Sequence, residues 1–61
     1  MRVFADCTPI IDDSKEKSIV EWLQNNLEAK VSKNALKCVK FEVKKTEVRG
    51  QKMIVGIIFC E

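Results

Sequence analysis

The sequence predicts an α+β fold: a single small domain in the order β-α-β-β, with one long helix packed on one face of a three-stranded, mainly antiparallel sheet. Two observations support this fold class. Apolar residues recur at helical spacing over one central segment, and on either side of it they alternate or run together as in strands. The chain shows no internal repeat and no linker, so residues 1–61 are interpreted as one domain.

The bulk composition is that of a globular chain. Hydrophobic residues make up 46% of it, charged residues make up 33%, and the net charge is only +2. The apolar content is too high for a disordered chain, and the small net charge argues against a dedicated nucleic-acid-binding protein. A chain of about 60 residues buries only about 60% of its extended surface, so we expect it to gain stability from a partner.

The first strand is expected over residues 2–7, where small or apolar residues alternate with longer side chains. Pro9 weakens the continuation of this strand because it has no N–H to give to a ladder. A helix is then expected from about residue 15 to residue 31. Its apolar face is formed by Ile19, Val20, Leu23, Leu27 and Val31.

The ends of this helix are marked by polar residues. Asp13 is the expected N-cap, with Glu16 as its capping-box partner, and Ser14 is a second candidate for the cap. The helix should end near residues 32–34, where Asn34 tolerates a left-handed backbone. Trp22 flanks the apolar face and is interpreted as a residue at the edge of the core, with an exposed binding hot spot as the alternative.

A hairpin follows the helix. Its strands are expected over Leu36–Val48 and Met53–Cys60, joined by a turn over residues 49–52. The last strand is apolar on both faces, which is typical of a central strand or of an interface, and it is far too short to span a bilayer. Gly56 within it indicates a bulge or a close packing contact.

The hairpin register decides which residues share a face. A two-residue turn at Gly50-Gln51 would pair Val43 with Ile58, whereas a three-residue loop over residues 50–52 would pair Val43 with Phe59. The second register segregates apolar from polar residues better and is preferred. It predicts that the helix covers Val39, Phe41, Val43, Val55, Ile57 and Phe59.

One helix cannot cover both faces of a sheet, so this register leaves an uncovered face. That face is the candidate interface, and its apolar residues are Leu36, Cys38, Val48, Ile54, Ile58 and Cys60. We expect it to be partly wet or to be buried against a second copy or another protein.

The residues needed for catalysis are missing. There is no histidine, and two glycines are too few for a phosphate-binding loop. Asp12 and Asp13 are interpreted as residues of the helix start. We therefore expect no enzyme, no catalytic residue, no cofactor and no metal site.

The three cysteines form no CxxC pair, and the sequence begins with no recognisable signal peptide. They are expected to be reduced thiols in a cytoplasmic protein.

Basic residues gather in the hairpin region: Lys40, Lys44, Lys45, Arg49 and Lys52. One hypothesis is that they contact nucleic acid. Glu42 and Glu47 interleave with them, and no aromatic stacking platform accompanies them, which favours a solvated edge strand instead. Nucleic-acid binding therefore stays the alternative function.

The strand order and the hairpin residues 41–43, 49–50 and 55–59 resemble the dodecins, a family of small flavin-storing oligomers. The resemblance covers topology over the whole chain. That family carries a tryptophan in its second strand, where this chain has Val39, Lys40 and Phe41. Flavin binding is therefore not implied. The sequence favours a non-enzymatic binding or regulatory module that acts through protein–protein association.

Overall fold

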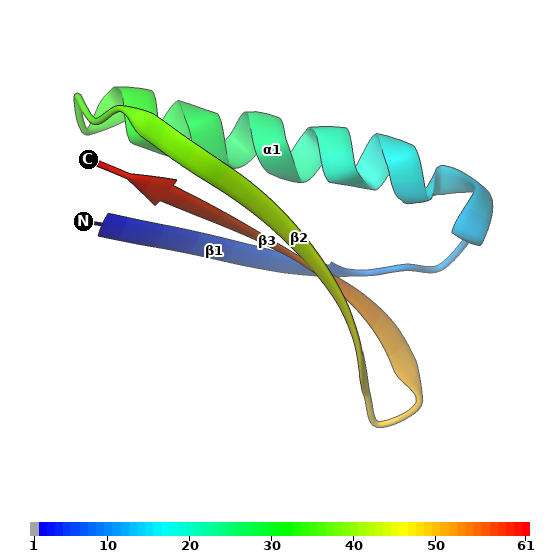
Figure 1. Ribbon diagram of the computed structural model, residues 1–61. Helices are drawn as coiled ribbons and strands as arrows, with labels where there is room; N and C mark the ends of the chain where they lie inside the picture. The colour runs from blue at the N-terminus through cyan, green and yellow to red at the C-terminus, as the bar shows by residue number, and fades with distance from the viewer. Residues whose placement is uncertain (1) are drawn as a thin grey trace.

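The computed structural model describes residues 2–61. Its elements are β1 (Arg2–Pro9), the short 3-10 helix η1 (Asp13–Lys15), α1 (Glu16–Lys33), β2 (Cys38–Val48) and β3 (Gln51–Cys60). The three strands form one sheet in the order β1-β3-β2, and β3 runs antiparallel to both neighbours. The predicted α+β class, the β-α-β-β order and the central position of the last strand are confirmed (Figure 1).

The helical segment begins one residue earlier than expected. Asp12, and not Asp13, is the capping residue: its carboxylate accepts hydrogen bonds from the Ser14 backbone N–H at 3.0 Å and from the Ser14 hydroxyl at 2.8 Å. These two bonds hold the pKa of Asp12 below its ordinary value, because they favour the charged carboxylate. Glu16 starts α1 and makes no capping box with Asp13.

At the other end, α1 stops at Lys33 and the left-handed residue is Ala35, with φ of 55°, while Asn34 keeps a negative φ. The Asn34 side chain instead donates to the Lys30 carbonyl at 2.8 Å. The Leu36 N–H reaches back to the Val31 carbonyl at 3.0 Å, so free carbonyls of the last turn are satisfied.

Neither of the hairpin registers weighed from the sequence is correct. The turn has two residues, Arg49 and Gly50, with φ of 53° and 78°, and Val48 pairs with Gln51. Two consecutive positive φ values are typical of the type I′ turn, whose twist matches that of the strands. Val43 consequently pairs with Gly56, and a bulge at Val39 shifts the register near the end of the hairpin.

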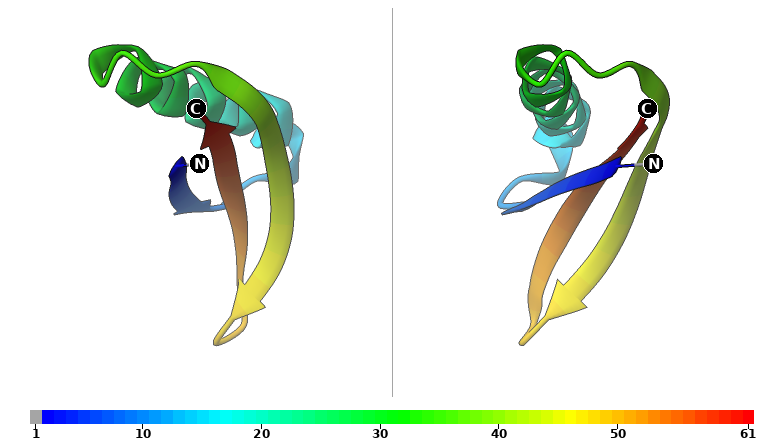
Figure 2. Two further views of the ribbon diagram at one scale, coloured as in Figure 1. Left: turned by 60° about the vertical axis from the view of Figure 1, so that its left-hand side comes forward. Right: turned by 90° about the vertical axis from the view of Figure 1, so that its left-hand side faces the viewer.

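The helix covers one face of the sheet (Figure 2), and this is the predicted side of β2, with Phe41 and Val43, but the opposite side of β3 from the predicted one. The core lies between α1 and the face of β3 that carries Ile54, Ile58 and Cys60, each 0% exposed. Leu23, Leu27 and Val31 of α1 are buried against it.

Gly56 explains why the helix takes this face. A Cβ on Gly56 would lie 3.2 Å from Cδ1 of Leu27 and 3.3 Å from Cε1 of Phe41. The helix therefore approaches the sheet closely over the only position of β3 that has no side chain. The prediction that Gly56 marks a close packing contact is confirmed.

The molecule is elongated because the tip of the hairpin extends beyond the helix and beyond β1 (Figure 1). Its principal extents are 36 × 20 × 15 Å. None of the helices formed by residues 2–61 combines the length and apolar character needed to cross a membrane.

Candidate functional site

The side of the sheet that faces away from α1 is called the open face. Alternation along each strand, read from the observed register, assigns its residues. They are Val3, Ala5, Cys7 and Pro9 on β1; Gln51, Met53, Val55, Ile57 and Phe59 on β3; and Lys40, Glu42, Lys44, Thr46 and Val48 on β2.

The centre of the open face is apolar. The four apolar β3 side chains, Met53, Val55, Ile57 and Phe59, are only partly buried, and among residues 2–61 no element covers them (Figure 2). The four β1 residues beside them carry no charge, and Val3 is 53% exposed. Two of the three strands thus present a continuous uncharged surface to solvent.

The charges of the open face lie along one rim, on β2. Lys40 Nζ contacts the Glu42 carboxylate at 2.8 Å, and their side chains are 63% and 34% exposed. The hydrogen bond from Lys40 and its positive charge hold the pKa of Glu42 below its ordinary value, and Lys44 adds a smaller effect in the same direction. Glu42 is therefore a carboxylate flanked by two lysines at neutral pH.

The prediction of an uncovered apolar face is confirmed, but of the six residues assigned to it from the sequence only Val48 lies there. Ile54, Ile58 and Cys60 are buried under α1, and Leu36 packs against the same core. The remaining two are exposed: Val48 pairs with Gln51 on the open face, whereas Cys38 pairs with Cys60 on the helix side.

Sequence reasoning placed Val55, Ile57 and Phe59 in the core because β3 is apolar on both faces, so its alternation could not identify the buried side. The missed signal is Gly56. A helix packs most closely over a strand residue without a side chain, which assigns Ile54 and Ile58 to the buried face together with Gly56.

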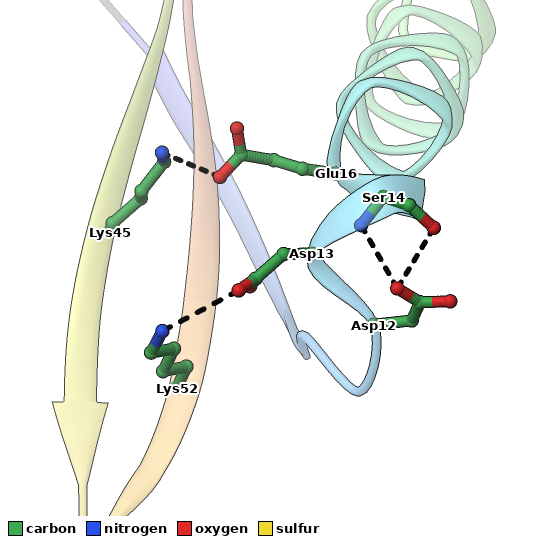
Figure 3. Close-up of polar contacts among 6 residues, drawn as sticks. All are labelled: Asp12, Asp13, Ser14, Glu16, Lys45 and Lys52. Carbon is green, nitrogen blue, oxygen red and sulfur yellow. Dashed lines mark hydrogen bonds and ion pairs between the residues drawn. The ribbon is translucent and has the colours of Figure 1, made fainter.

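The basic residues of the hairpin do not form one patch. Lys40 and Lys44 lie on the open face, whereas Lys45 and Lys52 lie on the helix side and contact carboxylates of the helix start. Lys45 Nζ is 2.5 Å from Glu16, and Lys52 Nζ is 3.7 Å from Asp13 (Figure 3). The structure therefore separates the residues that the nucleic-acid alternative would need to act together.

These two ion pairs cross an open cleft of about 570 Å³ between η1 and the part of the hairpin next to its turn. Its lining residues are Ile10, Asp13, Glu16, Lys45, Thr46, Glu47, Lys52 and Met53. The charged groups that face each other are already paired and exposed to solvent. Within residues 2–61 no three potential metal ligands cluster anywhere.

Trp22 is not a core residue, because it is 53% exposed. It lines a shallow groove of about 290 Å³ beside β1, together with Thr8, Lys15, Ser18 and Ile19. The interpretation of Trp22 as a core-edge residue is therefore wrong, and the indole is accessible from solvent.

The three cysteines are free thiols in three different environments. Cys7 is exposed on the open face, Cys38 is exposed at the start of β2, and Cys60 is buried and donates from Sγ to the Arg2 carbonyl at 3.4 Å. Cys38 pairs with the buried Cys60 across the ladder, so it belongs to the helix side of the sheet.

Comparison with protein-family models, with curated proteins and with solved structures finds no match to this chain.

Proposed function

We propose that this chain is a non-enzymatic protein-association module that works as a homodimer, with the open faces of two copies packed against each other. The observation that carries this proposal is the open face itself: a row of four apolar β3 side chains that the single helix leaves uncovered. A sheet of this kind becomes fully buried only when a second layer lies on its other side.

The isolated chain exposes more surface than a compact protein of its mass, which supports the proposal that a second layer covers the sheet. Its accessible surface is 4516 Å². A compact monomer of 7.0 kDa is expected to expose about 4,000 Å². The radius of gyration, 12.1 Å, likewise exceeds the value of about 10.5 Å expected for a compact domain of this length.

The open face also has the layout of a protein interface, with an apolar centre and a charged rim. The eight residues from Met53 to Cys60 span about 26 Å, and three strands span about 14 Å, so each copy contributes a plane of about 360 Å². Two such planes amount to about 720 Å², which is below the roughly 1,200 Å² at which stable interfaces begin and is the size of a weak, transient contact. We therefore expect a reversible dimer rather than an obligate one.

A second copy of the chain can cover the open face without any other protein. The partner offers an apolar plane of the same size, and packing two sheets face to face is a common way to complete a small core. A chain of this length is marginal alone, so dimerisation also raises its stability by mass action.

Sedimentation across a wide concentration range tests the proposal. The variant Val55→Thr/Ile57→Thr keeps β-branched side chains but places two hydroxyls in the centre of the open face. Wild type should pass from monomer to dimer with increasing concentration, and the double variant should remain monomeric while its circular dichroism stays that of wild type.

The control variant is Ile11→Thr. Ile11 is 91% exposed in the connector before η1, so this change makes the same chemical substitution away from the open face. Ile11→Thr should dimerise like wild type. A wild-type chain that stays monomeric at every concentration contradicts the proposal, and so does a double variant that dimerises as well as Ile11→Thr.

A further inference from the structure

We infer that the two copies meet about a two-fold axis that crosses the strands at the level of Gly56, and that Glu42 of each copy pairs with Lys44 of the other. This inference rests on the proposed function and adds the register and the recognition element of the dimer. A two-fold interface brings the same surface of both chains together, so its charges must complement themselves.

The apolar row fixes the centre of the contact. The apolar open-face residues of β3 are residues 53, 55, 57 and 59, and the midpoint of this row is Gly56. An axis at that level, perpendicular to the strands, places Val55 opposite the partner's Ile57 and Met53 opposite the partner's Phe59. The four positions of each row are then all covered, and any shift along the strand leaves an apolar side chain uncovered.

The charged rim agrees with this centre. On β2 the level of Gly56 is that of Val43, which lies midway between Glu42 and Lys44. The same axis lays β2 along the partner's β2 in the opposite direction. Glu42 then faces the partner's Lys44, Lys44 faces the partner's Glu42, and Lys40 faces the neutral Thr46 of the partner.

The neighbouring registers are electrostatically unfavourable. An axis moved by one residue toward Ile57 places Glu42 opposite the partner's Glu42, because Glu42 is level with Ile57 in the sheet. An axis moved by one residue toward Val55 places Lys44 opposite the partner's Lys44, because Lys44 is level with Val55. Like charges directly opposite each other are destabilising, so they select the central register.

An axis parallel to the strands is the remaining arrangement. It would lay β2 over the partner's β1, whose open-face residues carry no charge. Glu42 would then lose water without gaining a cation from the partner. Packed sheets lie about 10 Å apart, a gap that Lys and Glu side chains reach across from opposite rims. The charges therefore favour the axis that crosses the strands.

A mixing experiment with two charge-reversal variants tests this register. Glu42→Lys places a third cation on the rim, between Lys40 and Lys44, and Lys44→Glu places a second carboxylate there beside Glu42. Each variant alone should dimerise about tenfold more weakly than wild type, because two attractive contacts become repulsive. Mixed together, they should form a heterodimer in which both contacts are attractive again.

Isotope labelling of one variant lets native mass spectrometry separate the two homodimers from the heterodimer. The matched control mixture combines Glu47→Lys with Lys17→Glu, which change the net charge by the same two units in each direction but lie off the open face. The control mixture should give the statistical proportion of heterodimer.

The inference is overturned if Glu42→Lys and Lys44→Glu also mix in the statistical proportion, or if both dimerise like wild type. In either case, if wild type dimerises and Val55→Thr/Ile57→Thr does not, the open face is still supported as the interface. The two proposals therefore fail independently.

Discussion

At the scale of single residues, Glu42 is the group on the open face whose ionisation the structure controls most clearly. Its contact with Lys40 lowers its pKa, so the folded chain favours the charged form. A group with a lowered pKa stabilises the fold above its ordinary pKa and loses that contribution as the pH falls through the lowered value. The same protonation would remove the anion that faces the partner's Lys44.

The lowered pKa of Glu42 predicts how dimerisation responds to acid. Glu42→Gln should weaken dimerisation at neutral pH, and the difference from wild type should shrink and disappear as the pH falls through the lowered pKa of Glu42, because the protonated carboxyl carries no charge. Sedimentation equilibrium of both proteins from pH 7 downward measures the difference. A difference that is the same at every pH would show that the Glu42 charge plays no part.

At the scale of elements, the contact between α1 and β3 decides which face of the sheet is open. The helix packs tightly against the sheet at Gly56, where an added Cβ would also be 3.4 Å from Leu23 Cβ. Contacts of this length require the neighbours to move by a few tenths of an ångström. Substitution at this position therefore tests how tightly the helix is seated.

Gly56→Ala should destabilise the fold by about 1 kcal/mol, and Gly56→Val by more, because added volume in a packed contact forces the helix away from the strand. Urea unfolding at concentrations that keep the chain monomeric measures the loss. Ala5→Val is the control, since it adds volume to a strand on the open face, where no helix lies. A Gly56→Ala variant as stable as wild type would contradict the close packing.

The element scale also shows what sequence reasoning could reach. Helix and strand positions follow from periodicity, and the centrality of β3 follows from its apolar character on both faces. The register did not follow, because Arg49 adopts a positive φ that a residue with a Cβ rarely takes, so the turn has two residues, Arg49 and Gly50, in place of the preferred three-residue loop over residues 50–52. Relative to that preferred register, Val43 pairs with Gly56 instead of Phe59, and a shift by an odd number of residues exchanges the two faces of β3 relative to β2.

The candidate site was also predictable only in part: its existence could be predicted from the sequence, but its residues could not. An uncovered sheet face follows from the presence of a single helix, whatever the register, and this expectation is correct. Naming the residues of that face requires the register, so Ile54 and Ile58 were assigned to the interface although they form the core. The rim contact between Lys40 and Glu42 needs the strand geometry and could not be read from spacing alone.

At the scale of the whole molecule, the central proposal is that the chain forms half of a two-layered assembly. The elongated shape, the surplus surface and the apolar open face are three consequences of a sheet that carries a single helix. The three native cysteines report on this proposal without any substitution. Cys7 would be covered in the dimer, Cys38 lies outside the open face, and Cys60 is buried in each copy.

The most direct measurement is maleimide labelling of the wild-type chain under reducing conditions, with each modified thiol located by peptide mass. As the protein concentration rises through the monomer–dimer transition, labelling of Cys7 should slow strongly relative to Cys38, and Cys60 should remain protected throughout. A constant ratio of Cys7 to Cys38 labelling in a chain that has dimerised would contradict an interface on the open face.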